Sequence, residues 1–391
     1  EVAKRMGWHE AFDYPDSASI FREFAAQTGF ENAGQRILDI SNLAAIDKAG
    51  YDTLLPFQWG EGSPFANRAF STPDGKARLV PVRHSPRSGG PGALPLRLNT
   101  GRYRDQWHTM TRTGLSPKLS QHRREPLVEA HPDTIGRYGL EDGGLARVET
   151  AAGASIFRVA SSESQRRQEL FVPIHWTDQN SSGGRTGLLP TTDRDPVSGQ
   201  PGFKNTPARI TPYRADWSGF LLTHDCPGAP DCAYWTHVRT ARGWLTELAG
   251  LGDPAALMAL LPKGERVEMI DGRRGNIRSA VLVEGRLQAV LFVARAGGLP
   301  QREWLIGQLG AAGASSVELL AGRSAVPSLD RGPIVCACFD IGMATIVDAI
   351  ASQALTSVEA VGKAINAGTN CGSCRPAISR LFAQEKGTIH A

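Results

Sequence analysis

The spacing of hydrophobic residues changes along the chain and separates segments of different expected structure. Between Pro95 and Tyr213, short apolar runs are divided by turn residues. Leu145–Thr150 and Ile156–Ala160 flank a small-residue turn and predict a β-hairpin. Further strands are expected at Leu96–Leu98, Leu170–Ile174 and Ala208–Ile210. Several short strands at this spacing indicate a barrel or a sandwich.

The chain before this region has no self-contained hydrophobic pattern. A helix is expected around Ile20–Ala25, entered through Asp16 or Ser17, and Phe70–Arg78 predicts a loop, a turn and then a strand. So many turns with so little apolar periodicity indicate that residues 1–83 are the tail of a larger domain. Residues 84–94 are rich in Gly, Pro and Ser and predict a linker.

Two further patterns follow the strand-rich region, which we delimit as 95–215. Residues 216–330 predict a small α+β module, with strands at Arg266–Ile270, Ile277–Val283 and Arg286–Ala294 and a helix opened by Pro300. We find no catalytic constellation in this module.

Residues 331–391 read as helical. The apolar side chains Met343, Ile346, Val347 and Ile350 fall on one helical face. Thr356–Glu359 fits a capping box before a helix to about Ala367, with Gly368 suited to its stop. A third helix is expected at Arg375–Gln384.

Four of the six cysteines form two close pairs in this last segment. Cys336 and Cys338 have one residue between them, and Cys371 and Cys374 have two. Two such pairs on short loops can bring four thiolates together, as a tetrahedral zinc or a small iron–sulfur cluster requires. Known zinc pairs are mostly spaced by two to four residues, so the tighter first pair favours a cluster, with zinc as the alternative.

The other two cysteines, Cys226 and Cys232, lie in a Pro- and Gly-rich stretch near His224 and His237. Nothing in the sequence fixes the shape of that stretch. An incidental surface loop is therefore favoured over a metal site.

Composition narrows the possible functions without identifying one. With 391 residues, 41% of them hydrophobic, the chain suits several globular domains. Its formal charge of +4 is small and its basic residues are scattered, which gives no case for nucleic acid. No apolar run approaches membrane-spanning length. The cysteine pattern favours a reducing compartment, and we expect a cytoplasmic location.

The loop after the first predicted strand carries the chemistry of a ligand site. Gly101 allows close backbone approach, and Arg102 and Arg104 can pair with phosphate oxygens. Trp107 offers a stacking face, while His108 and Thr109 offer hydrogen bonds. This set suits an anionic, aromatic ligand, although an exposed polar loop would look similar.

Both features resemble known families. Val335–Phe339 together with Ala367–Pro376 resembles the 2Fe–2S domain of the bacterioferritin-associated ferredoxin family, including all four ligand positions. Leu98–Gly114 resembles the dinucleotide-binding domain of molybdopterin oxidoreductases, among which the assimilatory nitrate reductase catalytic subunit is most similar. The resembling segments also include Ser120–His122, Val128–Pro132, Phe171–Trp176 and Asp195–Pro201.

The second resemblance implies a fold and a set of contacts. The fold is multidomain α+β, with a six-stranded double-psi β-barrel, then a small α/β module and a small all-α iron–sulfur domain. The barrel binds part of two molybdopterin guanine dinucleotides that hold molybdenum. The implied cofactor contacts are Thr100, Gly101, Arg102, Tyr103, Arg104, Asp105, Gln106, Trp107, His108, Thr109, His175, Trp176 and Lys204. The implied metal ligands are Cys336, Cys338, Cys371 and Cys374.

The resemblance also implies an activity and partners. The expected reaction is the reduction of nitrate to nitrite, with electrons supplied by a reductase subunit, a flavodoxin or a ferredoxin. The chain starts at Glu1 without a Met, so we expect it to be a C-terminal half. A 4Fe–4S cluster and the molybdenum ligand then belong to the missing half, and no catalytic residue can be named. The alternatives are a formate dehydrogenase-like enzyme and an inactive module that only binds cofactor and transfers electrons.

Overall fold

The structure is a computed structural model that describes residues 1–60, 65, 67–70, 72–81, 94–182, 186–196, 198–295, 298–326 and 331–388, and side chains only to 382 in the last helix. It divides into two compact units, Glu1–Arg87 and Ser88–Ala391, which are considered separately. The predicted linker 84–94 lies outside the described residues apart from residue 94. No helix in the described part of the chain is long and apolar enough to cross a membrane.

The first unit consists of short helices and turns. Its elements are α1 (Val2–Arg5), α2 (Ser17–Gly29), the 3₁₀ turn η1 (Ser41–Leu43) and α3 (Lys48–Asp52). The predicted entry to α2 is confirmed, because the Asp16 side chain accepts a hydrogen bond from the Ser19 amide at 2.8 Å. The strand expected at the end of Phe70–Arg78 is wrong. The described residues there pair with no other strand, and Leu79 just beyond is 91% exposed.

The second unit begins with a closed six-stranded barrel. Its strands are β1 (Leu96–Gly101), β2 (Leu127–Ala130), β3 (Leu145–Thr150), β4 (Ala154–Ser161), β5 (Glu169–Pro173) and β6 (Thr206–Tyr213), in the order β1-β5-β2-β4-β3-β6. The predicted hairpin is confirmed by the antiparallel register of Leu145 with Arg158. Inward-facing Leu98, Phe157 and Leu170 are fully buried in the barrel core. The barrel is thus closed, while its double-psi connection pattern stays a prediction.

Short helices cover the barrel connections. They are η2 (Thr113–Leu115), α4 (Pro117–Ser120), α5 (Pro132–Arg137) and η3 (Thr186–Leu188).

The pairing of β1 with β5 decides where the site lies. These two strands run parallel, with Gly101 opposite Pro173, so the segments that follow them leave the barrel at the same end.

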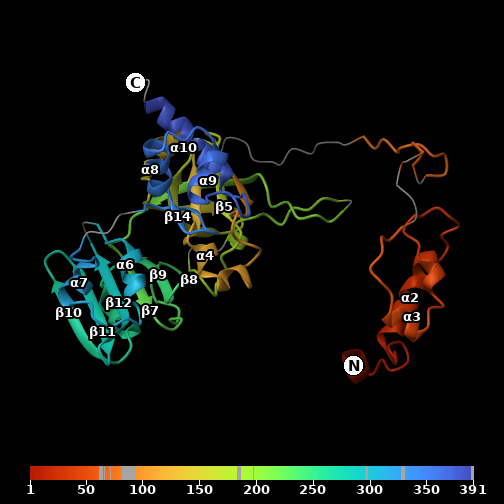
Figure 1. The fold of residues 1–391 in the computed structure, drawn as a ribbon, viewed down its shortest axis with the longest axis horizontal. Helices are drawn as coiled ribbons and strands as arrows, with labels where there is room; N and C mark the ends of the chain where they lie inside the picture. Colours follow the sequence, from red (N-terminus) through yellow and green to blue (C-terminus); the bar gives the residue numbers. More distant parts are fainter. Residues whose placement is uncertain are drawn as a thin grey trace. The chain divides into compact units, whose positions relative to one another are not determined.

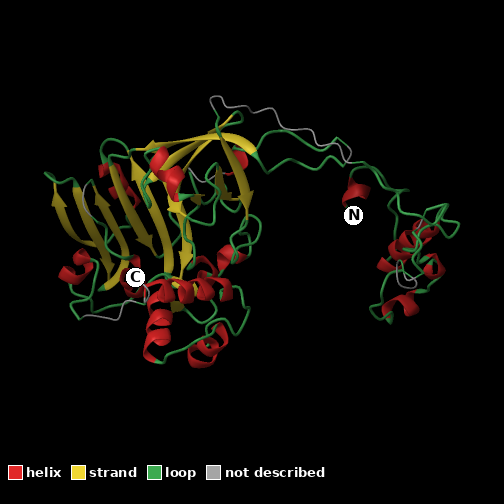
Figure 2. Cartoon of the chain, turned by 90° about the horizontal axis from the view of Figure 1, so that it is seen from above, coloured by secondary structure: helices red, strands yellow, loops and turns green. Residues whose placement is uncertain are grey.

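A six-stranded antiparallel sheet follows the barrel. Its strands are β7 (Trp217–Thr223), β8 (Tyr234–Thr240), β9 (Gly243–Gly250), β10 (Glu265–Asp271), β11 (Asn276–Val283) and β12 (Arg286–Ala294), in the order β10-β11-β12-β7-β9-β8. Figure 2 shows the strands of the second unit as yellow arrows. Helices α6 (Arg302–Gln308) and α7 (Ser316–Ala321) pack into the hydrophobic cluster on one face of the sheet (Figure 1). The 3₁₀ segment η4 (Pro254–Leu260) packs into the cluster on the other face. The three predicted strands are confirmed. The predicted helix begins at Arg302 rather than at Pro300, with Gln301 as its cap.

The C-terminal module contains three helices, α8 (Met343–Ser352), α9 (Val358–Ile365) and α10 (Arg375–Thr388), around a small core that includes Ile346 and Val361 (Figure 1). It is not purely helical, because β13 (Ile334–Cys336) pairs with β14 (Ile341–Gly342) where the chain folds back around the first cysteine pair.

Three details of this module correct the prediction. The hydroxyl of Ser357, not Thr356, caps α9 by accepting the Ala360 amide at 3.1 Å. That helix ends at Asn366, whose φ of +63° is left-handed, before Gly368 is reached. Met343 is 40% exposed and is not part of the core face.

Candidate functional site

The predicted ligand loop leaves the barrel at the end of β1 and is held by the segment that follows β5. The imidazole of His175 is fully buried between two points of the loop. Its Nε2 accepts the backbone N–H of Tyr103 at 2.8 Å, and its Nδ1 lies 2.6 Å from the carbonyl oxygen of His108. These partners require the tautomer protonated on Nδ1. His175 therefore ties together the two ends of the loop turn.

The protonation state of His175 agrees with this role. Burial lowers its pKa below the ordinary value, and the nearby Arg102 acts in the same direction, although the bond to the His108 carbonyl opposes them. A neutral imidazole can accept one hydrogen bond and donate the other, whereas an imidazolium could not accept the Tyr103 amide.

An aromatic cluster stabilises the same loop from below. Tyr103 and Trp176 are buried and meet edge to face, with ring centroids 5.7 Å apart, and Met110 and Phe171 complete the group. Burial raises the pKa of the Tyr103 hydroxyl, which accepts the Leu127 amide at 2.9 Å. Tyr103 and Trp176 thus support the loop from inside the protein.

Polar side chains fix the remainder of the loop. Gln106 is buried, and its carbonyl accepts the hydroxyl of Thr113 at 2.7 Å. The hydroxyl of Thr100 donates to the carbonyl of Phe203 at 3.1 Å. That bond fixes the segment carrying Lys204 beside the end of β1, and the Lys204 side chain is exposed there.

Gly101 is required by the protein's own packing. A Cβ at this position would lie 2.6 Å from the Phe171 ring. The glycine therefore lets the loop leave β1 directly over that aromatic side chain. The close contact at the Cβ position is thus with Phe171, while the approach of the Gly101 backbone to a ligand stays a prediction.

Some of the predicted cofactor contacts in the loop are exposed, so their side chains can reach a ligand. Arg102 lies over the indole of Trp107, with its guanidinium carbon 4.6 Å from the ring centroid, and Trp107 is 55% exposed. His108 and Thr109 follow on the exposed side, and His108 has a left-handed φ of +45°. A cation stacked on an exposed indole, next to free hydrogen-bonding groups, fits a ligand with a phosphate and a flat ring.

Arg104 and Asp105 face the cysteine module instead. Nη1 of Arg104 donates to the Ser373 carbonyl at 3.5 Å, and Nη2 donates to the Val335 carbonyl. Nε of Arg104 donates to Oδ2 of Asp105 at 3.1 Å. The structure thus separates the loop into an Arg102 side open to solvent and an Arg104 side in contact with the cysteine loops.

The four predicted metal ligands meet as two pairs, each with one cysteine from each loop. The Sγ atoms of Cys338 and Cys371 are 3.4 Å apart, and Cys336 and Cys374 interact in the buried half of the site. Burial raises the pKa of the Cys374 thiol to about 11, while the Ser373 hydroxyl, 3.2 Å from the Cys371 sulfur, lowers the pKa of that thiol. Two sulfur pairs match the ligand requirement of a two-iron cluster.

Among the residues that the structure describes, which include all four of these cysteines, no group of three or more His, Cys, Asp or Glu side chains is placed to hold a single metal ion. Cys226 is exposed and Cys232 is partly buried, both as free thiols, and Nε2 of His237 donates to the Gln179 carbonyl at 2.9 Å. The incidental-loop interpretation of Cys226 and Cys232 stays a prediction.

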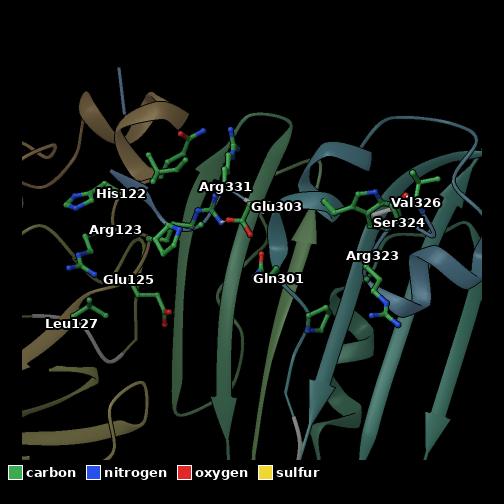
Figure 3. Close-up of a pocket in the computed structure, with 18 of the residues that line it drawn as sticks. His122, Arg123, Glu125, Leu127, Gln301, Glu303, Arg323, Ser324, Val326 and Arg331 are labelled. Atoms are coloured by element: carbon green, nitrogen blue, oxygen red, sulfur yellow. Dashed lines mark hydrogen bonds and ion pairs between the residues drawn. The ribbon is translucent and has the colours of Figure 1, made fainter. Parts of the chain in front are cut away.

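A large cleft adjoins the Arg104 side of the loop. Its volume is about 1190 Å³, and it is lined by barrel residues 121–125 and 127, sheet-module residues 300, 301, 303, 304 and 322–326, and residues 331–334 of the cysteine module. Figure 3 shows His122 and Arg123 on its barrel side and Arg323 and Ser324 opposite. Nδ1 of His122 lies 2.9 Å from Oδ2 of Asp105, so the cleft wall connects directly to the loop.

The sequence had not indicated His122, Thr113 or Phe171 as supports of the site. Ser120–His122 had been noted only as part of a resembling segment, and each of these side chains acts on a loop residue through the fold. A His beside a short Pro-initiated helix is a faint signal, and no local pattern identifies its partner.

Comparisons with known proteins agree with this geometry. Residues 96–207 match the family described as "Molydopterin dinucleotide binding domain", and residues 334–384 match "BFD-like [2Fe-2S] binding domain". The nitrate reductase of Klebsiella oxytoca is 34% identical over 395 residues, covering 98% of this chain and 45% of that protein. The nitrate reductase of Shewanella frigidimarina is 27% identical and covers 98% of this chain and 46% of its own length.

A third relative is the assimilatory nitrate reductase catalytic subunit of Bacillus subtilis, 33% identical over 54% of this chain and 30% of that protein. The chain spans less than half the length of these curated relatives. It therefore combines a molybdopterin dinucleotide-binding domain with a BFD-like [2Fe–2S]-binding domain, and over nearly its whole length it is a homologue of nitrate reductases.

Proposed function

We propose that the chain is the cofactor-binding and electron-entry part of a molybdenum-dependent assimilatory nitrate reductase. The observation that carries this proposal is the arrangement of two sites in one compact unit. The loop presenting Arg102 and Trp107 adjoins, through Arg104, the loops that bear the four cysteines. Relatives that match 98% of the chain are nitrate reductases, which supports nitrate as the substrate.

The proposed ligand of the exposed loop is molybdopterin guanine dinucleotide. Arg102 would pair with a phosphate, Trp107 would stack on a ring, and His108, Thr109 and Lys204 would donate hydrogen bonds. Thr100, Tyr103, Gln106, His175 and Trp176 would act by holding the loop in place. When bound, the molybdenum cofactor supplies the two-electron reduction of nitrate to nitrite, and this half of the protein supplies binding and orientation.

The proposed role of the cysteine module is to accept electrons from another protein. Cys338 and Cys371 lie on its more exposed side, where a donor such as a reductase subunit, a flavodoxin or a ferredoxin can approach. A 4Fe–4S cluster in the remainder of the enzyme would complete the route. We place this enzyme in the cytoplasm, because a cluster held by thiolates and two further free cysteines suit a reducing compartment.

The proposal also assigns domain boundaries. Residues 1–83 would end the catalytic domain, 95–215 would form the dinucleotide-binding barrel, 216–330 the sheet module and 331–391 the cluster domain. The two units separate between Arg87 and Ser88, within the proposed linker 84–94, which supports this division.

The test uses the full-length enzyme that contains this chain. The expected result is nitrate-dependent oxidation of a reduced viologen, and no formate-dependent reduction of the oxidised dye. Formate oxidation without nitrate reduction would replace the proposal with a formate dehydrogenase. Full nitrate reductase activity of the 391-residue chain alone would contradict the proposal that this chain supplies only cofactor binding and electron entry.

A further inference from the structure

One side chain of the dinucleotide loop reaches both cysteine loops. Arg104 donates from Nη1 to the Ser373 carbonyl at 3.5 Å and from Nη2 to the Val335 carbonyl. Ser373 directly precedes Cys374, and Val335 directly precedes Cys336. A single guanidinium therefore fixes the backbone beside one cysteine of each loop.

The two cysteines beside Arg104 are the buried ones. Cys336 and Cys374 are each 2% exposed, whereas Cys338 is partly buried and Cys371 is exposed. A cluster bound by these residues has an inner side, facing Arg104, and an outer side, facing solvent. The inner side is the one directed toward the dinucleotide loop.

The guanidinium is itself held in position. Oδ2 of Asp105 accepts Nε of Arg104 at 3.1 Å and lies 2.9 Å from Nδ1 of His122. The side chains of Arg104 and Asp105 are 21% and 8% exposed, so solvent screens their charges only in part. Removing the charge of Arg104 would leave the carboxylate of Asp105 near the cysteines with His122 as its remaining neighbour.

A cleft lies beside Arg104. Its volume is about 1190 Å³, and it lies between barrel residues 121–125 and 127 and residues 331–334, which lead into the first cysteine pair. The two hydrogen bonds of Arg104 therefore join the barrel to the cysteine module next to an open space.

We propose that Arg104 is a positioning residue that docks the inner side of the [2Fe–2S] cluster onto the dinucleotide-binding loop. The proposal rests on the electron-entry function argued above. Reduction adds one negative charge to the cluster, and a nearby cation stabilises the reduced form. Arg104 should therefore raise the midpoint potential of the cluster as well as hold its domain in place.

The experiment uses the 391-residue chain with its cluster reconstituted anaerobically. Arg104→Gln, Arg104→Lys and Asp105→Asn are compared with Arg166→Gln, which removes a positive charge from a barrel side chain that is 84% exposed. The readouts are iron and sulfide content, the midpoint potential from a titration followed by electron paramagnetic resonance, and the rate at which trypsin releases the C-terminal segment.

The expected results differ in sign. Arg104→Gln should shift the potential to more negative values and speed tryptic release several-fold, whereas Asp105→Asn should shift the potential to more positive values. Arg104→Lys should keep a potential near wild type, with release at an intermediate rate. Arg166→Gln should change neither quantity.

Two results would overturn the proposal. The first is an Arg104→Gln variant with an unchanged midpoint potential and an unchanged rate of tryptic release. The second applies if Arg104→Gln fails to take up the cluster. In that case, a wild-type potential and a wild-type release rate in both Asp105→Asn and Arg104→Lys would contradict the proposal. These measurements need neither molybdenum nor nitrate, so a failure of the proposed enzyme activity would be seen separately.

Discussion

Nε2 of His175 accepts a hydrogen bond from the backbone N–H of Tyr103 at 2.8 Å, across 72 positions of sequence. The same imidazole reaches the His108 carbonyl through Nδ1. Because β1 and β5 run parallel, the residues after each strand meet at one end of the barrel. The shape of the dinucleotide loop therefore depends on a buried side chain outside it.

Replacing His175 should loosen the loop. His175→Ala removes both hydrogen bonds and leaves the Tyr103 amide without its acceptor, which should cost about 1–3 kcal/mol of unfolding free energy. The measurement is denaturant unfolding of the chain, with His224→Ala as the control, since the His224 side chain is 59% exposed. Equal stability of the two variants would contradict the assigned role.

The stability of the barrel should fall as the pH is lowered. Burial lowers the pKa of His175 from 6.5 in the folded state, so the unfolded state binds more protons in the window between the folded pKa and 6.5. This contribution is complete above 6.5 and is lost as the pH falls through the folded pKa. Burial also lowers the pKa of His122 and of His237, which adds to the same trend.

The slope of stability against pH measures this effect. Unfolding midpoints taken between about pH 7.5 and pH 5.5 should decrease, and His175→Gln should flatten the decrease. A His175→Gln variant with the same slope as the wild type would show that His175 is not the titrating group.

Removing Arg102 should weaken cofactor retention. In the full-length enzyme, Arg102→Ala removes a charged hydrogen-bond donor, which should cost on the order of 1.5–3 kcal/mol of binding free energy if the contact is buried by the ligand. Trp107→Ala should have the same direction, because it removes the ring beneath the guanidinium. Unchanged molybdopterin content and turnover in both variants would refute the loop assignment.

The cysteine pairs should bind a two-iron cluster rather than zinc. Anaerobically purified chain should contain iron and acid-labile sulfide and show the visible absorbance of a [2Fe–2S] centre. Cys336→Ser and Cys371→Ser should each remove most of it, whereas Cys226→Ser should leave it intact. Stoichiometric zinc without sulfide would establish the alternative.

The sequence predicted those parts of the fold whose patterns are local. The hairpin of β3 and β4 shows alternation around a small-residue turn, and β11 and β12 are apolar runs joined by the turn at Glu284 and Gly285. Strand β2, which has four residues, was not predicted. Strand β7 was also missed, although its run of five buried residues is similar to the run of six in the predicted β12.

For the candidate site too, the sequence predicted local features but not contacts between residues far apart in the chain. The cysteine spacing and the composition of the Arg102–Thr109 loop are properties of short segments and could be identified directly. The contact of Arg104 with Val335 spans 231 positions, and no periodicity encodes it. The division of that loop into supporting and exposed residues likewise depended on Phe171 and His175, which only the closed barrel brings beneath it.

The most direct test of the account removes the cysteine module from the full-length enzyme. An enzyme truncated after residue 330 should keep its molybdenum cofactor and should reduce nitrate with a small artificial donor, which can reach the inner centres directly. It should fail with its physiological reductase, because the entry point for that electron donor is gone. Equal turnover of the truncated enzyme with both donors would contradict the assignment of the [2Fe–2S] domain as the site of electron entry.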